Sequence, residues 1–219
     1  MERIETVVVG GGQAGLATSY FLKQEGREHV VLEQAAQAGN AWRTGRWDSF
    51  TVVTPNWSVR MPGAEYSGPD PDGFMPRDEI VAYFEQYADR FQLPMQYSTR
   101  VVSIEQLDSS GYRVQTDTGI FEADNVVIAT GFEQLPKIPP FASDLPSDIT
   151  QLHSSAYRNP QSLPSGAVLV VGSAQSGCQI AEELYQSGLQ VYLSTGASSG
   201  RAPRRYRGQD TFKIGRAHV

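Results

Sequence analysis

The chain has 219 residues, of which 40% are hydrophobic and 19% charged, and its formal net charge is −6. This composition is typical of a globular protein with a hydrophobic core and excludes a disordered chain. The acidic balance disfavours a nucleic-acid surface, because a cluster of basic residues occurs only within Arg201–Arg207. Small-molecule chemistry is the function class that fits best.

Two further classes are disfavoured by short features of the sequence. The apolar run Thr6–Val9 stops at Gly10, so neither a signal peptide nor a membrane span is predicted, and a cytoplasmic protein is expected. Cys178 is the single cysteine. It excludes an intrachain disulfide, a paired-cysteine redox motif and a cysteine zinc site, which disfavours the thioredoxin-reductase type of flavoenzyme. No metal site is expected.

The N-terminal residues predict a βαβ unit. A short, buried strand is expected over Glu5–Val9, a turn over Gly10–Gly15, a helix over Gln13–Glu25 and a second strand over His29–Glu33. The stretch Gln37–Asp72 is rich in Gly, Pro, Asn and Trp and has no sustained period, so an ordered loop region is predicted there.

A helix is predicted next, with Asp78 as its N-cap and its end before Pro94. Five apolar positions at steps of three and four are expected on its buried face. They are Ile80, Phe84, Tyr87, Ala88 and Phe91.

A β-meander and a second βαβ unit follow along the chain. The meander is predicted from three strands, over 100–105, 112–116 and 120–129. The Pro- and Ser-rich segment 132–164 is interpreted as a connection between domains. The second βαβ unit is expected to have a strand over 167–171, a turn over 172–177, a helix from about 177 to 186 and a strand over 190–194.

The first turn matches the pattern G-x-G-x-x-G. Gly10 permits the tight turn, Gly12 lets the backbone approach a pyrophosphate, and Gly15 allows close packing of the helix on the strand. Glu33 ends the second strand, where a carboxylate accepts hydrogen bonds from a ribose diol. Together these features predict a dinucleotide site; the alternative is a glycine turn that serves packing alone.

The second turn, Gly172–Gly177, departs from the pattern at one position. Ala174 occupies the middle glycine position, where its methyl group is expected to push the pyrophosphate outward or to require a slight backbone shift. At the end of the following strand, Ser194 followed by Thr195 stands in place of an acid, and Arg201, Arg204 and Arg205 come after them. This favours NADPH over NADH; the alternative is that these arginines are solvated.

The two loops, with an Ala129–Thr130–Gly131 turn between them, resemble the class B flavoprotein monooxygenases over essentially Ile4–Phe212. Within that group the chain is similar to an uncharacterised bacterial flavin-dependent oxidoreductase family. That narrower resemblance is carried by four strings, Trp47–Phe50, Thr54–Trp57, Leu152–Pro160 and Arg204–Gly208.

The resemblance implies an α/β flavoprotein fold with two Rossmann-like dinucleotide-binding domains. Residues 1–150 are expected to be the N-terminal part of a three-layer FAD domain, with the meander at about 100–124. Residues 160–213 are expected to begin a truncated NAD(P)H-binding domain. The last six residues, Ile214–Val219, are encoded by ATCGGAAGAGCACACGTC, which looks like a sequencing adapter. They are interpreted as an adapter-derived tail on an N-terminal fragment; the alternative is a natural basic tail.

The resemblance also implies the cofactor contacts. Trp42, within a segment that resembles Gly-Gly-x-Trp, would form an aromatic wall beside the flavin, and Val102 would approach the adenine through its backbone. The residues implied for FAD are Gly10, Gly12, Gln13, Ala14, Gly15, Glu33, Gln34, Asn40, Trp42, Val102, Ala129, Thr130 and Gly131. Those for NADPH are Gly172, Ser173, Gln175, Ser176, Gly177, Arg204 and Arg205.

Two departures bear on oxygen activation. The monooxygenase fingerprint F-x-G-x-x-x-H-x-x-x-Y-R is present only in its second half, as His153, Tyr157 and Arg158. Its Phe and Gly positions hold Ser147 and Ile149. The flavin-facing Asn of the flavin-containing monooxygenases aligns with Val53, and Asn56 follows three residues later. For His153 the alternative is a structural role, and for Trp47 and Trp57 the alternative is a place in the hydrophobic core.

The resemblance implies that NADPH reduces FAD and that a C4a-peroxyflavin transfers oxygen from O2 to a small organic substrate. Trp42 and Asn56 are the candidate catalytic residues. The protein would supply orientation and exclude water, because the cofactor carries the reaction. Two alternatives are a non-oxygenating FAD/NAD(P)H oxidoreductase and an inactive nucleotide-binding fragment.

Overall fold

The computed structural model describes residues 2–108, 110–131, 135–196 and 205–211. The chain forms two compact units. The first unit comprises Met1–Thr44, Arg60–Glu65 and Asp78–Leu135, and the second comprises Gly45–Val59, Tyr66–Arg77 and Pro136–Val219. The predicted tail and Arg201 and Arg204 lie outside the described residues. The domain boundaries expected from the sequence stay predictions.

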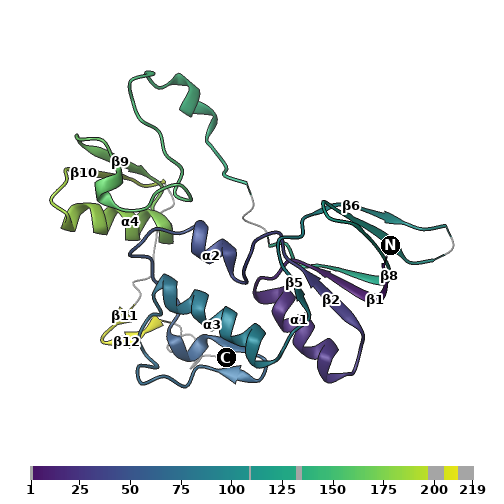
Figure 1. Ribbon diagram of the computed structural model, residues 1–219. Coiled ribbons are helices and arrows are strands. Elements are labelled where there is room, and N and C mark those ends of the chain that lie inside the picture. Colours follow the sequence, from purple (N-terminus) through teal and green to yellow (C-terminus); the bar gives the residue numbers. More distant parts are fainter. Residues whose placement is uncertain (1, 109, 132–134, 197–204, 212–219) are drawn as a thin grey trace. The chain divides into compact units, whose positions relative to one another are not determined.

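A six-stranded sheet in the order β5-β2-β1-β8-β7-β6 forms the first unit (Figure 1). Strand β1 pairs in parallel with β2 and β8, and β7 pairs antiparallel with β6 and β8, so β8 joins the meander to the parallel sheet. The strands are β1 (Glu2–Val9), β2 (His29–Leu32), β5 (Met95–Gln96), β6 (Val101–Gln106), β7 (Tyr112–Thr116) and β8 (Ile120–Ile128). The predicted strands are confirmed, whereas the two-residue β5 is additional.

The core of the first unit lies on both faces of β1. Val7 and Val8 point to opposite faces, yet both are fully buried, as expected of a central parallel strand. Helix α1 (Gln13–Gln24) packs against β1 and β2 and buries Leu16 (Figure 1). In the main core cluster, Val114 and Phe121 of the meander join residues of β1 and β2.

The helix that follows the predicted loop region is α3 (Arg77–Arg90). The predicted positions Ile80, Phe84, Tyr87 and Ala88 are buried, while Phe91 lies just beyond the helix end and packs on the Tyr87 ring at 4.9 Å. The helix begins one residue earlier than expected. Asp78 is therefore not its N-cap but lies in the first turn, where a carboxylate is favoured by the helix dipole.

The predicted loop region contains several short elements. They are α2 (Asn40–Thr44), the 3-10 helix η1 (Asn56–Ser58), and the hairpin strands β3 (Arg60–Met61) and β4 (Ala64–Glu65). The prediction of a loop alone was wrong here, because elements of two to five residues are too short to show a period. The hairpin is held to α3 by Tyr87, whose hydroxyl donates to the Pro62 carbonyl at 2.8 Å.

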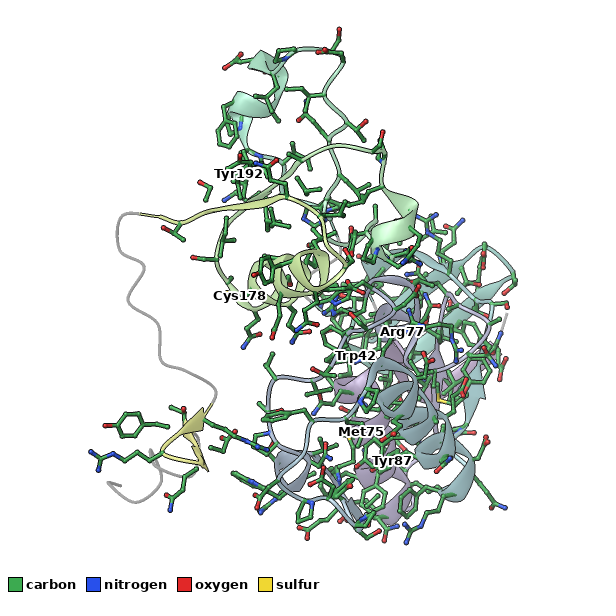
Figure 2. All side chains as sticks on the ribbon, turned by 90° about the vertical axis from the view of Figure 1, so that its left-hand side faces the viewer. Trp42, Met75, Arg77, Tyr87, Cys178 and Tyr192 are labelled. Atoms are coloured by element: carbon green, nitrogen blue, oxygen red, sulfur yellow. The ribbon has the colours of Figure 1, made fainter. Side chains whose placement is uncertain are left out.

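The second unit contains the second βαβ motif, with parallel strands β9 (Val168–Val171) and β10 (Val191–Ser194). Helix α4 (Gln175–Gln186) begins two residues before the predicted start and buries Ile180, Ala181 and Leu184. Figure 2 shows Cys178 on α4 and Tyr192 on β10. The other elements are the 3-10 helices η2 (Pro140–Asp144) and η3 (Pro160–Ser162), and strands β11 (Arg205–Tyr206) and β12 (Gln209–Asp210). None of the helices within the described ranges is long and apolar enough to span a membrane.

Candidate dinucleotide sites

The first glycine loop brings the start of α1 against the end of β1. Gly10 has a φ of +110°, and a Cβ there would lie 2.5 Å from the Ala129 carbonyl oxygen. A Cβ on Gly15 would lie 1.8 Å from the Gly10 carbonyl oxygen. No side chain fits at either position. Ala129 in turn donates its N–H to the Val9 carbonyl at 2.8 Å, so the Ala129–Gly131 turn lies beside the loop, as predicted for a turn over the cofactor.

The N-terminus of α1 is open at Gly12. This residue has extended backbone angles, φ −86° and ψ −169°, and no side chain caps the helix. A Cβ on Gly12 would meet no atom within 4 Å. The two following residues, Gln13 and Ala14, are exposed. An uncapped helix end with free space before it is the geometry that binds a phosphate, so the loop fits the diphosphate of FAD.

Glu33 lies at the end of β2 and is buried, with only 8% of its surface exposed. Its Oε2 accepts from the Gly11 N–H at 2.7 Å, and its Oε1 accepts from the Ala35 N–H at 2.8 Å. Each carboxylate oxygen retains a further lone pair. The carboxylate is therefore held in place and remains able to accept from a ribose hydroxyl, whereas the neighbouring Gln34 is exposed.

The segment that carries Trp42 is attached to the first glycine loop. Gly39, with a φ of +68°, donates its N–H to the Gly11 carbonyl at 3.4 Å, and α2 starts at the next residue. The Trp42 ring lies 6.4 Å from the Phe84 ring of α3 and is half-buried (Figure 2). Asn40 turns its amide along α2 toward the Thr44 hydroxyl at 3.5 Å. The role of Trp42 as a flavin wall stays a prediction.

Val102 occupies an irregular position in β6. The pairing with β7 shifts between Val101 and Ser103, so that Val102 has no partner residue across the ladder. Its side chain is 63% exposed. A bulge of this kind leaves backbone groups outside the regular ladder. This geometry is compatible with the predicted backbone contact to adenine, and that contact stays a prediction.

The second glycine loop repeats the backbone geometry of the first. Gly172 has a φ of +100°, and a Cβ on Gly177 would lie 1.9 Å from the Gly172 carbonyl oxygen. Ala174 adopts φ −74° and ψ −176°, close to the angles of Gly12. The expected backbone shift at Ala174 is therefore absent, because extended angles are open to any L-residue. Its methyl group remains the difference that a pyrophosphate would meet.

The end of β10 corresponds to the end of β2. Gly172 donates its N–H to the Ser194 carbonyl at 3.0 Å, as Gly10 does to the Leu32 carbonyl at 2.8 Å. Ser194 is exposed. Arg205 donates to the Asp72 carbonyl at 2.8 Å, and its guanidinium lies 5.4 Å from the centre of the Phe74 ring. No contact between Arg205 and the second loop is described, and its role toward NADPH stays a prediction.

The fingerprint residues make structural contacts in the second unit. Tyr157 is 3% exposed, and its hydroxyl donates to Glu183 Oε2 of α4 at 2.7 Å. Burial, followed by the nearby Glu183 carboxylate, raises the pKa of Tyr157 far above its usual value. His153 Nδ1 accepts from the Ser155 N–H at 3.2 Å within a turn. These contacts correspond to the structural alternative for His153.

Asp48 is a residue whose contacts sequence reasoning missed. Its Oδ2 accepts from Asn159 at 2.7 Å, and its Oδ1 accepts from Arg77 at 2.8 Å. These hydrogen bonds, that of Asn159 first, lower the pKa of the Asp48 carboxyl. The Asp48 N–H also donates to the Arg158 carbonyl at 2.8 Å. Asp48 thus joins the segment after Trp47 to the fingerprint segment, although more than a hundred residues separate them.

Asn56 and Trp47 are both buried in the second unit. The Asn56 amide donates to the Asp70 carbonyl at 2.9 Å, and its Oδ1 has no hydrogen-bond partner among the described residues. Trp47 is 1% exposed and packs edge-on against Phe50 at 5.1 Å, in agreement with the core alternative. In the described ranges, no group of three or more His, Cys, Asp or Glu residues is arranged to hold a metal ion.

Two alanine substitutions in the first loop separate folding from cofactor binding. We expect Gly12→Ala to leave the thermal stability of the apoprotein nearly unchanged, because its Cβ meets open space, but to lower FAD affinity roughly tenfold or more, about 1.4 kcal/mol. We expect Gly15→Ala to destabilise the apoprotein strongly, because its Cβ would meet the Gly10 carbonyl. Thermal unfolding and flavin fluorescence titration measure the two effects. Equal destabilisation by both variants would contradict this assignment.

Comparison with known proteins agrees with this geometry. The chain is 41% identical over 209 residues to the uncharacterized CzcO-like oxidoreductase of Geobacillus kaustophilus (strain HTA426), covering 95% of this chain and 59% of that protein. It is 28% identical over 223 residues to indole-3-pyruvate monooxygenase YUCCA1 of Oryza sativa subsp. japonica, covering 99% and 55%. The chain thus spans little more than half the length of these curated relatives.

A solved structure and a family model give the same result. The flavin-containing monooxygenase from Stenotrophomonas maltophilia matches with a TM-score of 0.85 and 27% identity, over 99% of this chain and 64% of that one. The predicted α/β flavoprotein fold is thereby confirmed. A family model described as pyridine nucleotide-disulphide oxidoreductase matches residues 7–207. With both glycine loops inside that match, the chain belongs to the pyridine nucleotide-disulphide oxidoreductase family.

Proposed function

We propose that the protein carrying this chain is an FAD-dependent, NADPH-driven monooxygenase that acts on a small organic substrate with O2. The observation that carries the proposal is the pair of equivalent glycine loops, of which only the first is followed by a buried carboxylate. Glu33 directly follows β2, and the equivalent position directly after β10 is occupied by Thr195. Two loops that share a backbone geometry but differ in the residue that follows the second strand of each unit are suited to two different dinucleotides.

The first loop is assigned to FAD. Membership of the family implies FAD and a pyridine nucleotide as cofactors. The open α1 N-terminus at Gly12 would hold the diphosphate and Glu33 would accept from the ribose, while the segment of Trp42 lies next to the loop. When bound, FAD would accept a hydride from the nucleotide and, in its reduced form, would activate O2. The residues of the chain bind and orient the cofactor and exclude water.

The second loop is assigned to NADPH. A carboxylate directly after β10 would repel the 2′-phosphate of NADPH, and Thr195, which occupies the position of Glu33, instead offers a neutral hydroxyl. The uncapped N-terminus of α4 is available to the pyrophosphate, with Gln175 exposed in its first turn. The proposed preference for NADPH over NADH rests on these features.

Oxygenation is favoured by the similarity to two monooxygenases, the solved Stenotrophomonas structure and the rice protein. A second candidate function, a non-oxygenating FAD/NAD(P)H oxidoreductase, is supported by one specific observation. Val53 and Ile149 occupy positions at which the flavin monooxygenase pattern has Asn and Gly. The Oδ1 of Asn56 is buried and has no hydrogen-bond partner among the described residues. We propose that the Asn56 amide takes the place of the Asn that the pattern has at the position of Val53.

The nucleotide preference is tested by Thr195→Glu. We expect this variant to lose about tenfold or more in the affinity for NADPH relative to NADH, because the new carboxylate repels the 2′-phosphate and accepts from a ribose diol. Thr195→Gln, which places a neutral side chain of similar size to Glu there, is the matched control. The ratio of the dissociation constants, measured by calorimetry, gives the result. An unchanged ratio in Thr195→Glu would remove the second loop as the site of discrimination.

The oxygenation step is tested by reducing the flavin-loaded protein with NADPH in the absence of oxygen and then adding O2. We expect a transient flavin absorbance that differs from both the reduced and the reoxidised spectra, since a monooxygenase holds oxygen on its cofactor. Direct return to oxidised flavin would favour the non-oxygenating oxidoreductase. A colourless protein that takes up no FAD would support an inert nucleotide-binding module.

A further inference from the structure

Gln179 of α4 makes two hydrogen bonds to the backbone of one residue in another part of the second unit. Its Nε2 donates to the Thr51 carbonyl at 3.0 Å, and its Oε1 accepts from the Thr51 N–H at 3.4 Å. The amide thus satisfies both backbone groups of Thr51, in the way a neighbouring strand would. We refer to Gly45–Val59, which contains Thr51, as the Trp47 loop.

A second route joins α4 to the Trp47 loop through the fingerprint segment. Tyr157 donates to Glu183 of α4 at 2.7 Å. The residues that follow it contact Asp48, because the Arg158 carbonyl accepts from the Asp48 N–H and Asn159 donates to the Asp48 carboxylate. Within the described residues, the Trp47 loop is therefore joined to α4 directly through Gln179 and indirectly through the fingerprint segment.

The Gln179 contact lies close to the proposed nucleotide site. Gln179 follows Gly177 by two residues, so the phosphate-binding end of α4 and the contact to Thr51 belong to the same first turns of one helix. The contact borders a polar hollow of about 210 Å³ within the second unit. Ser49, Thr51, Gln179, Glu182, Glu183 and Gln186 line it.

The Trp47 loop also continues a segment that the proposed function assigns to FAD. It starts at Gly45, directly after α2, which carries Trp42, and it contains Asn56. Thr51 further forms an isolated bridge with Pro76, and Val52 donates to the Met75 carbonyl at 2.9 Å. Within the second unit, the contacts of Gln179 thus continue through Thr51 and Val52 to Met75 and Pro76.

We propose that Gln179 is a positioning residue that couples dinucleotide binding at the second glycine loop to the order of the Trp47 loop. The inference rests on the proposed function, because it takes the second loop as a nucleotide site. A ligand at the N-terminus of α4 stabilises conformations in which the first turns of the helix are intact. Gln179 makes both bonds to Thr51 from those turns, so the loop shares the stabilisation.

The test is hydrogen exchange of the 219-residue chain with and without saturating NADP⁺. In the unsubstituted chain we expect NADP⁺ to slow exchange about tenfold or more both in 172–186 and in 45–59, since exchange reports local opening. Gln179→Met has a side chain of similar length without the amide. In this variant the slowing in 172–186 is expected to persist, whereas that in 45–59 falls to less than about a third of its original value.

Gln186→Met is the matched control. Gln186 lines the same hollow on the same helix, and no hydrogen bond of its side chain occurs among the described residues. This variant is expected to behave as the unsubstituted chain. Gln179→Glu, which keeps the acceptor for the Thr51 N–H and loses the donor, serves if Gln179→Met does not fold, and it is expected to give an intermediate effect. Gln179→Met combined with Tyr157→Phe, which removes both routes, is expected to abolish the slowing in 45–59.

Three outcomes overturn the coupling. Equal slowing of the 45–59 amides in Gln179→Met and in the unsubstituted chain would show that Gln179 has no part in it. Slowing confined to 172–186 in the unsubstituted chain would show that the nucleotide site exists without the coupling. Absence of slowing in 172–186 would remove the second loop as a nucleotide site, and with it the proposed function as well as this inference.

Discussion

The close approach of a glycine to a backbone carbonyl determines the geometry of both proposed nucleotide sites. A Cβ would lie 1.8 Å from the Gly10 oxygen at Gly15 and 1.9 Å from the Gly172 oxygen at Gly177. Only glycine permits the helix to start this close to the strand. Because the same contact recurs, α1 and α4 present their uncapped N-termini at the ends of β1 and β9 in the same way, and the differences between the two sites arise from the residues around them.

Those surrounding residues make the two sites chemically different. At the first loop, β8 brings Ala129 against Gly10, and the buried Glu33 carboxylate is held by two backbone N–H groups. At the second loop, a Cβ on Gly172 would meet no atom within 4 Å, and the position that corresponds to Glu33 holds Thr195. The first site therefore has a fixed acceptor for a ribose, while the second has no negative charge at that place.

Much of the fold was predictable, because its signals are local. The strands of the βαβ units and the meander were correctly located from apolar runs and turn residues, and the buried face of α3 from the spacing of residues such as Phe84 and Tyr87. Short elements such as α2 were not predictable, since five residues show no period. The hydrogen bonds of Asp48 to Asn159 and of Gln179 to Thr51 join distant segments, and no local pattern indicates such pairs. At Ala174 the sequence correctly identified the departure, but only the backbone angles show that it requires no shift.

We propose above all that one chain holds two dinucleotides at two separate sites. This is measured most directly by a calorimetric titration of the FAD-loaded chain with NADP⁺, with bound flavin followed by its absorbance after gel filtration. We expect one NADP⁺ to bind per chain and the FAD content to stay unchanged. Displacement of FAD by NADP⁺ in equal amounts would show that both nucleotides compete for the first loop and would contradict the proposal of two separate sites.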